Sequence, residues 1–254
     1  MNNFKIKNFK FNKNNKPYII AEMSANHNED FDTVNAIIDA AANAGADALK
    51  VQTYTADTIT LECDRPDFLI CNEDSPWNGW RIYDLYKKAS LNWDWLGEIN
   101  DICREKRITF FSSVFDDTSV DFLERLNVPA YKIASFEITD HILIKKIAET
   151  GKPVIISSGM ASKGELEDAV NLLRENGTTQ ICMLKCTSAY PAKPDDANLL
   201  TIKNMMESFN VIGGLSDHTL GVEVPIAAVC LGARIIEKHF TLSRDSGSAD
   251  DAFS

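Results

Sequence analysis

The sequence lacks the features that would place the protein in a membrane or on a nucleic acid. No run of apolar residues reaches the ~18 that a membrane-spanning helix needs. No apolar segment follows the N-terminal lysines, as it would in a signal peptide. Lysine and arginine number 26 against 37 aspartate and glutamate, which gives a formal net charge of −11. We therefore expect neither a membrane partner nor a nucleic-acid partner.

Cysteine pairs and histidine are also scarce. The six cysteines, at positions 63, 71, 103, 182, 186 and 230, contain no Cys-x-x-Cys pair and no disulfide-like spacing. We interpret them as reduced, mostly buried thiols and expect a cytoplasmic protein. Only four histidines are present, so a histidine-based site has to draw on His27, His141, His218 and His239.

A repeated strand and helix unit accounts for most of the chain. With 254 residues and 44% apolar content, the sequence can form one domain with a sizeable core. From Pro17 onward, apolar strands alternate with amphipathic helices. The expected strands are residues 18–23, 48–53, 109–113, 130–134, 153–157, 180–186, 211–215 and 233–238. Eight such units predict an α/β fold, a (β/α)8 TIM barrel, with a doubly wound open sheet as the lesser alternative.

Three segments depart from this repeat. Residues 1–16 alternate apolar and polar side chains on either side of Asn8, which predicts an N-terminal β-hairpin that plugs one end of a barrel formed by residues 17–254. Residues 54–92 form a long polar, aromatic-rich connection, which we expect to act as a lid or interface. The sequence ends at Ser254 with no eighth helix, so we expect a barrel truncated after strand 8 and incomplete at its C-terminus.

Polar side chains recur at the C-terminal ends of the predicted strands, where barrel enzymes carry their sites. Two lysines, Lys50 and Lys132, lie within otherwise apolar strands, where an unpaired ammonium costs several kcal/mol. Together with nearby serine hydroxyls they suit a phosphate or carboxylate group. The alternative is that each lysine forms an internal ion pair with Glu22, Glu137 or Glu237. The serines are Ser113, Ser135, Ser158 and Ser216.

Two histidines follow the last two predicted strands. Ser216 and His218 are two residues apart, as are Glu237 and His239, so each pair faces one side of an extended chain. Two imidazoles leave most of the coordination shell of a divalent cation open to water and substrate. Oxygen and imidazole donors suit Mn2+, Co2+ or Mg2+, and Zn2+ is also compatible. The alternative is that each histidine is a hydrogen-bonded polar group at a strand end.

Six motifs in order along the chain resemble the sialic acid synthases, barrel enzymes that condense phosphoenolpyruvate with an N-acetylated amino sugar. The forms at residues 25–28, 77–86 and 184–191 are most similar to the branch of that family that makes pseudaminate. The N-acetylneuraminate and legionaminate branches are the alternatives. The motifs are residues 21–28, 131–135, 157–160, 184–191, 214–221 and 236–240.

The resemblance implies roles for individual residues. His218 and His239 would bind the metal, with Mn2+ favoured over Mg2+ or Co2+, and Glu22 would be a catalytic carboxylate. Glu137, Tyr190 and Asp250 would contact the sugar, although residues 247–250 depart from the family's Gly-Gly-Pro-Asp-like turn. Ser188 stands where the neuraminate enzymes have asparagine. The residues expected to hold phosphoenolpyruvate are Lys50, Ser113, Lys132, Ser135, Ser158, Ser188 and Ser216.

The resemblance also implies a homodimer for the full-length protein. Family members carry a C-terminal antifreeze-like domain that reaches over the partner's barrel and contributes an arginine to the sugar site. We expect a chain without that domain to bind metal and phosphoenolpyruvate but to be impaired in turnover. Two other readings are an aldolase that uses a Lys132 Schiff base and a non-catalytic ligand-binding fragment.

Overall fold

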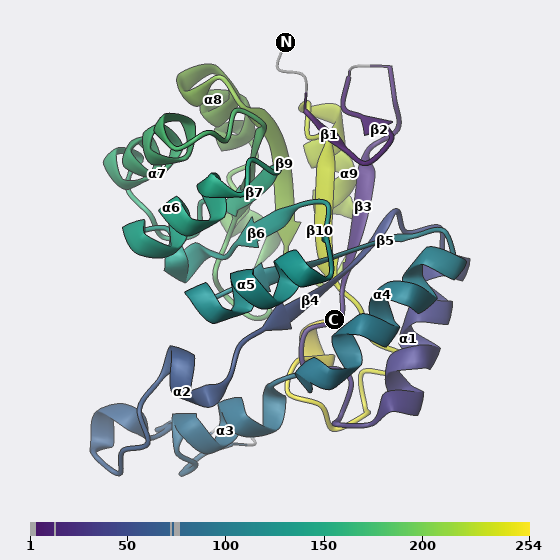
Figure 1. Ribbon diagram of the computed structural model, residues 1–254, viewed down its shortest axis with the longest axis vertical. Helices are drawn as coiled ribbons and strands as arrows, with labels where there is room; N and C mark the ends of the chain where they lie inside the picture. Colours follow the sequence, from purple (N-terminus) through teal and green to yellow (C-terminus); the bar gives the residue numbers. More distant parts are fainter. Residues whose placement is uncertain (1–3, 13, 72, 74–76) are drawn as a thin grey trace.

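The computed structural model describes residues 4–12, 14–71, 73 and 77–254, and it contains a closed barrel of eight parallel strands (Figure 1). The strands pair in the order β10-β3-β4-β5-β6-β7-β8-β9, so the last strand closes against the first. This confirms the predicted (β/α)8 barrel. The strands are β3 (Tyr18–Glu22), β4 (Ala48–Thr53), β5 (Thr109–Val114), β6 (Tyr131–Ile133), β7 (Val154–Ser157), β8 (Ile181–Cys186), β9 (Ile212–Asp217) and β10 (Ile235–His239).

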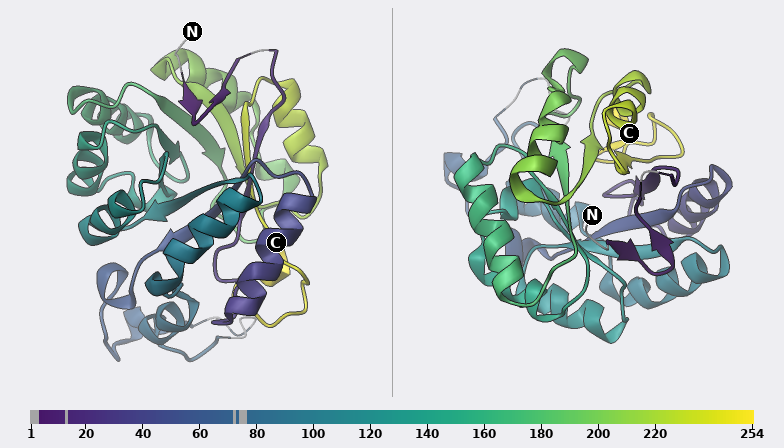
Figure 2. Two further views of the ribbon diagram at one scale, coloured as in Figure 1. Left: turned by 45° about the vertical axis from the view of Figure 1, so that its right-hand side comes forward. Right: turned by 90° about the horizontal axis from the view of Figure 1, so that it is seen from above.

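Helices surround the strands, as the view from above in Figure 2 shows. Local sequence sets their starts: Asp30 accepts hydrogen bonds from the first amides of α1, and Ser162 and Glu165 form a capping box at α7. None of the described helices is both long and apolar enough to cross a membrane. The barrel helices are α1 (Phe31–Asn43), α4 (Leu96–Glu105), α5 (Asp117–Arg125), α6 (His141–Glu149), α7 (Lys163–Glu175), α8 (Leu200–Phe209) and α9 (Glu223–Cys230).

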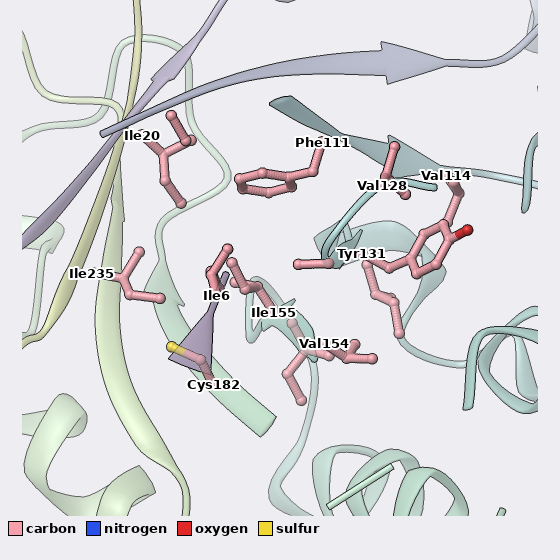
Figure 3. Packing of buried hydrophobic residues seen from close by; sticks show 14 of the residues in the cluster. Ile6, Ile20, Phe111, Val114, Val128, Tyr131, Val154, Ile155, Cys182 and Ile235 are labelled. Atoms are coloured by element: carbon pink, nitrogen blue, oxygen red, sulfur yellow. The ribbon is translucent and has the colours of Figure 1, made fainter. Parts of the chain in front are cut away.

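The interior of the barrel is apolar at the end where the strands begin. Ile20, Phe111, Ile155 and Ile235 are fully buried, and Figure 3 shows them pointing toward one another from separate strands. Because side chains alternate along a strand, the residues two positions further on also point inward, at the other end of the barrel. The fold therefore places Glu22, Ser113, Ser157 and Glu237 inside the barrel, near the C-terminal ends of the strands.

The hairpin of β1 (Lys5–Ile6) and β2 (Phe9–Lys10) covers this apolar end, as predicted. Phe4 and Ile6 are 1% exposed, and Figure 3 shows Ile6 among the inward side chains of the barrel. The amide of Lys5 donates to Gln180 Oε1 at 3.0 Å, which fixes the hairpin to the start of β8. Residues 1–3 and 13 of the predicted hairpin segment lie outside the described residues.

The segment between β4 and α4 contains helices that the sequence reading missed. These are α2 (Ala56–Ile59) and α3 (Ile82–Ala89), with short 3-10 turns η1 (Pro66–Phe68) and η2 (Trp93–Trp95). Figure 1 shows α2 and α3 at the end of the molecule opposite the hairpin. Arg81 anchors the start of α3 through an ion pair with Asp84 at 2.7 Å. The insertion therefore stands over the end of the barrel where the polar residues lie.

The last residues of the chain return to the same end. Residues 241–254, all of which the structure describes, form a loop with a 3-10 turn, η5 (Asp251–Phe253), and no α-helix. Asn26 holds this loop: its Nδ2 donates to Phe240 O at 3.0 Å, and its Oδ1 accepts from Ser248 Oγ at 2.6 Å. The first and last loops of the barrel thus pack together over the rim.

Candidate active site

A cavity of about 400 Å³ opens at the C-terminal ends of the strands. Nine of the predicted site residues line it, and they come from all eight units except β7 and its loop. Strand alternation explains the convergence of the residues that lie on strands, because each occupies an inward position of a parallel barrel; Ser135, Tyr190 and His218 follow the ends of β6, β8 and β9. The nine are Glu22, Lys50, Ser113, Lys132, Ser135, Tyr190, Ser216, His218 and His239.

Lys50 forms a buried ion pair at the floor of the cavity. Its Nζ lies 2.6 Å from Glu22 Oε2 and 3.9 Å from Glu237 Oε1, and it donates to Ser113 Oγ at 2.7 Å. Burial lowers the pKa of Lys50, but the two carboxylates outweigh this and raise it, so the ammonium persists. The internal ion-pair alternative is therefore correct for Glu22 and Glu237, and both pairs face the cavity.

Lys132 is less well compensated than Lys50. Its Nζ donates to Ser157 Oγ at 2.7 Å and to Ile133 O at 3.2 Å, while Glu237 Oε1 is 3.9 Å away. Burial lowers its pKa, and the Glu237 carboxylate offsets this only in part. An ammonium group in this state gains most from an added anion.

The turn after β7 gathers three of the predicted serines. Gly159 adopts φ +42°, and a Cβ there would lie 2.2 Å from Ser135 Cβ and 3.2 Å from Ser188 Oγ. Only glycine allows Ser135 and Ser188 to approach this turn so closely. Ser157, which sequence reasoning left out, faces the cavity, whereas the predicted Ser158 follows it at the rim. The signal in the sequence was strand alternation: Ile155 points into the barrel, so Ser157, two residues further along β7, points inward as well.

The two predicted metal-binding histidines come together on adjacent strand ends. Their ring centroids are 5.4 Å apart. His218 Nδ1 lies 2.9 Å from Thr187 O, whereas His239 Nδ1 is buried without a hydrogen-bond partner among the described residues and lies 3.8 Å from Asp250 Oδ2. Burial holds the pKa of His239 well below its usual range, which favours the neutral imidazole that metals bind.

The described residues contain no ready-made cluster of three or more histidine, cysteine, aspartate or glutamate side chains for a metal. The side chains present fit the site expected from the sequence, which has two imidazoles and open positions for other ligands. The unpaired Nδ1 of His239 is the strongest indication of a metal site, because a buried ring nitrogen without a partner is energetically costly unless a ligand binds it. His218 and His239 are therefore suited to hold a divalent cation together with substrate or water.

Cys186 is a cavity residue that the sequence reading classed only as a buried thiol. It lies at the C-terminal end of β8, faces the cavity and interacts with His218. Burial raises the pKa of this thiol, but His218, Ser135 and Lys132 together outweigh the effect and bring it to about 7. The alternation of Cys182, Leu184 and Cys186 along β8 was the signal that could have placed it inside the barrel.

A second, larger cavity of about 850 Å³ adjoins the first. Tyr190 and His239 line both, and Asp250, predicted to contact a sugar, lines the larger one. Its other walls are mostly apolar and come from the inserted segment and the last loop. They include Tyr54, Leu85, Tyr86, Ala89 and Phe253, none of which was predicted as a site residue.

Glu137 lies at the edge of the site, on the 3-10 turn η3 (Ser135–Glu137). Its Oε2 is buried without a hydrogen-bond partner among the described residues. Burial raises its pKa to about 7, although the Lys132 ammonium acts in the opposite direction. A carboxyl group in this state can donate or accept a hydrogen bond near neutral pH.

A polar chain connects the two cavities. Gln52 Nε2 donates to Glu22 Oε1 at 3.0 Å and to Ser24 Oγ at 2.9 Å, and Ser24 Oγ donates to Asp250.

His27 is not part of this polar chain, because its Nε2 lies 3.3 Å from Ala89 O and its Nδ1 accepts from Glu29 N. It ties α3 to the barrel and lines neither of the two cavities.

Fold and site together define a (β/α)8 barrel protein with a cavity at its C-terminal rim whose ammonium and hydroxyl groups suit a small anion, beside a larger, partly apolar pocket. The chain belongs to the NeuB family, whose model matches residues 37–254. This confirms the predicted relation to the sialic acid synthases.

Known relatives support the same placement. The chain is 46% identical to the pseudaminic acid synthase of Helicobacter pylori, over 94% of this chain and 69% of that one. It is 36% identical to the N,N'-diacetyllegionaminic acid synthase of Campylobacter jejuni, over 92% and 70%. The structure is similar to that of the N-acetylneuraminic acid synthetase of Leptospira borgpetersenii in complex with citrate, with a TM-score of 0.88, 32% identity, and 99% and 82% of the two chains covered.

Proposed function

We propose that this chain is the catalytic barrel of a pseudaminic acid synthase. In this reaction phosphoenolpyruvate, 2,4-diacetamido-2,4,6-trideoxy-L-altrose and water give pseudaminate and phosphate. The observation that carries the proposal is the cavity in which Lys50 and Lys132 converge with serine hydroxyls beside the histidine pair. The similarity to the Helicobacter pylori pseudaminic acid synthase supports this choice of substrate.

The smaller cavity suits phosphoenolpyruvate. Lys132 and Ser157 form one donor pair, and Lys50 and Ser113 form a second, so phosphate and carboxylate oxygens can each meet an ammonium and a hydroxyl. Glu22 and Glu237 balance the two ammonium groups when all four are ionised. An incoming multiply charged anion then needs further positive charge, which a divalent cation beside His218 and His239 would supply.

The metal would be held by His218 and His239, and Mn2+ is the cation we favour. When bound, it supplies Lewis-acid polarisation of a carbonyl oxygen. Asp250 lies 3.8 Å from His239 Nδ1 and lines the larger cavity, so it can orient a sugar hydroxyl next to the histidines. Tyr190 lines both cavities and would separate the two substrates.

The resemblance to the sialic acid synthases implies the bond changes that we propose. C3 of phosphoenolpyruvate attacks the sugar aldehyde, water adds to the cationic C2, and phosphate leaves with cleavage of the C–O bond. Glu22 is placed to accept the proton from that water, because burial raises its pKa and Gln52 orients its Oε1. Lys50 and Lys132 stabilise the charge on the departing phosphate.

The larger cavity favours a sugar with several methyl groups. The proposed acceptor carries two acetamido methyls and a C6 methyl, and Leu85, Tyr86 and Phe253 offer apolar surface for them. The N-acetylneuraminate acceptor has hydroxyls in place of some of these groups and would leave more of this surface unmatched. The legionaminate acceptor has the same groups in another configuration and is the closer alternative.

An assay of phosphate release separates these substrates. We expect the highest kcat/KM with the altrose-configured acceptor, a lower value with the legionaminate acceptor and the lowest with N-acetylmannosamine. A clear preference for either other sugar would overturn the choice of substrate. With 18O in the bridging C–O–P oxygen, label should appear in the phosphate; label retained in the sugar acid would contradict C–O cleavage.

Lys132 also fits a Schiff-base mechanism in one respect, since burial lowers its pKa. Borohydride reduction in the presence of pyruvate tests this alternative. We expect no adduct at Lys132, because its Nζ is engaged by Ser157 and Ile133 O. Formation of a stable adduct with loss of activity would favour the aldolase.

A homodimer and a cytoplasmic location remain predictions from the sequence.

A further inference from the structure

Backbone pairing alone does not fix the separation of the two histidines. The β9–β10 register ends with Lys238 opposite Asp217, one residue before His239 and His218. His239 itself pairs with Glu22 on β3, and the carbonyl of His218 accepts from Ala192 N at 2.9 Å, so the backbone of each histidine is held on one side. Neither contact joins the two histidines to each other, so a contact between β9 and β10 next to them can set the 5.4 Å separation of their ring centroids.

A side-chain lock lies at this point, on the outer face of the barrel. Lys238 Nζ lies 2.5 Å from Asp217 Oδ2 and also donates to the carbonyl of Thr219. Asp217 Oδ1 accepts from the amide of Thr219 at 3.2 Å and from its hydroxyl at 2.8 Å. Lys238 on β10 therefore contacts Asp217 and Thr219, the residues on both sides of His218.

Burial makes this contact specific. Asp217 and Thr219 are 2% and 3% exposed, so breaking the pair would leave a charged group without water. Alternation places Asp217 and Lys238 on the face opposite His218 and His239, so neither reaches the cavity. Their effect on chemistry must pass through the position of the histidines.

We propose that Asp217, Lys238 and Thr219 form a lock that sets the spacing of His218 and His239 for a divalent cation. Asp217 and Lys238 are then positioning residues for the metal site. The inference rests on the proposed function only in taking the histidine pair as the site of the cation. It predicts that changes to the lock weaken metal affinity more than they change any other step of the reaction.

Mn2+ binding to the full chain, followed by the EPR signal of free Mn2+, tests the lock. Lys238→Met should weaken Mn2+ binding about 10- to 100-fold. Lys238→Arg should stay within about threefold of the unaltered chain, because it keeps the charge that Asp217 requires. Activity of Lys238→Met should return at high Mn2+, with the KM for phosphoenolpyruvate unchanged at saturation.

Lys152→Met is the control for loss of an outer ion pair far from the histidines. Lys152 Nζ lies 2.6 Å from Glu124 Oε1, before β7 at the other end of the barrel, and Glu124 is more exposed than Asp217. We expect less than twofold change in its Mn2+ affinity. Equal weakening in Lys152→Met and Lys238→Met would mean general destabilisation and would overturn the lock, as would Mn2+ binding by Lys238→Met that matches the unaltered chain.

Thr219→Val keeps the inference testable if Lys238→Met does not fold. It removes one hydrogen bond to Asp217 with little change in shape, and we expect about 2- to 5-fold weaker Mn2+ binding. No change in that variant would contradict the lock. Lock-dependent Mn2+ binding in a chain that releases no phosphate with any acceptor would support the lock and overturn the proposed function. An unaltered chain that binds no Mn2+ would overturn the lock.

Discussion

The two ends of this barrel are built from the same strands but have opposite kinds of inward side chain, apolar at one end and polar or charged at the other. At the hairpin end the inward positions are apolar, for example Ile20, Phe111 and Ile235, and the hairpin excludes water from them. Two residues further along the same strands, the inward positions hold Glu22, Ser113 and Glu237. The comparison separates stability from function: one end contributes burial energy, and the other carries the buried charge that the proposed phosphoenolpyruvate site needs.

Lys132→Met should produce the largest loss of activity. Removing this ammonium deletes a charge at the phosphate site, and we expect kcat/KM to fall about 100- to 1,000-fold. The free energy of unfolding should also fall, because the buried Glu237 carboxylate loses one of its two ammonium partners. Steady-state kinetics at a temperature where the variant is folded and urea unfolding measure the two effects. Unchanged kcat/KM in the folded variant would show that this lysine supports the fold alone.

Gly159→Ala should also reduce activity, by about 100-fold, through backbone strain at φ +42° and the approach to Ser135. The KM for phosphoenolpyruvate should rise more than the sugar KM, because the displaced serines belong to the anion cavity. Gly151→Ala is the control: it has positive φ with no atoms near the added Cβ. Equal effects of the two changes on the KM for phosphoenolpyruvate would contradict this role of Gly159.

Ile6→Ala tests the other end of the comparison. Its side chain is 1% exposed and packs inside the barrel mouth, so we expect about 2–4 kcal/mol of lost stability in urea unfolding. Both KM values should stay within twofold, since the cavity lies at the opposite end. A change in metal or phosphoenolpyruvate binding at temperatures where the variant is folded would show that the two ends are coupled.

Sequence patterns were sufficient for residues whose position depends on strand alternation. Lys50, Lys132, His218 and His239 all lie where the parity of their strands places them. Whether Ser157 or Ser158 faces the cavity depends on a one-residue shift, because neighbouring residues of a strand point to opposite faces of the sheet. The motif contains both serines and did not decide between them. Leu85, Tyr86 and Phe253 meet only through the packing of an insertion and a distant loop, which local patterns do not encode.

Glu137 gives the smallest expected effect, and it depends on pH. Its pKa is about 7 in the folded chain against 4.5 for an ordinary glutamate, so the folded state binds more protons between these values. Stability should therefore fall by at most about 3 kcal/mol as pH rises from 4.5 to 7 and then level off. Glu137→Gln should remove this part of the fall. Parallel pH profiles of urea unfolding for the two chains would contradict the assignment.

Calorimetric titration of phosphoenolpyruvate into the full chain, with Mn2+ and then with a chelator, tests the anion site most directly. The two ammonium groups are already balanced by Glu22 and Glu237. We therefore expect at least tenfold tighter binding with Mn2+, and loss of most of that binding in Lys132→Met. Equal affinity in Mn2+ and in chelator, or full binding by Lys132→Met, would contradict a phosphoenolpyruvate site built from these lysines and the histidine pair.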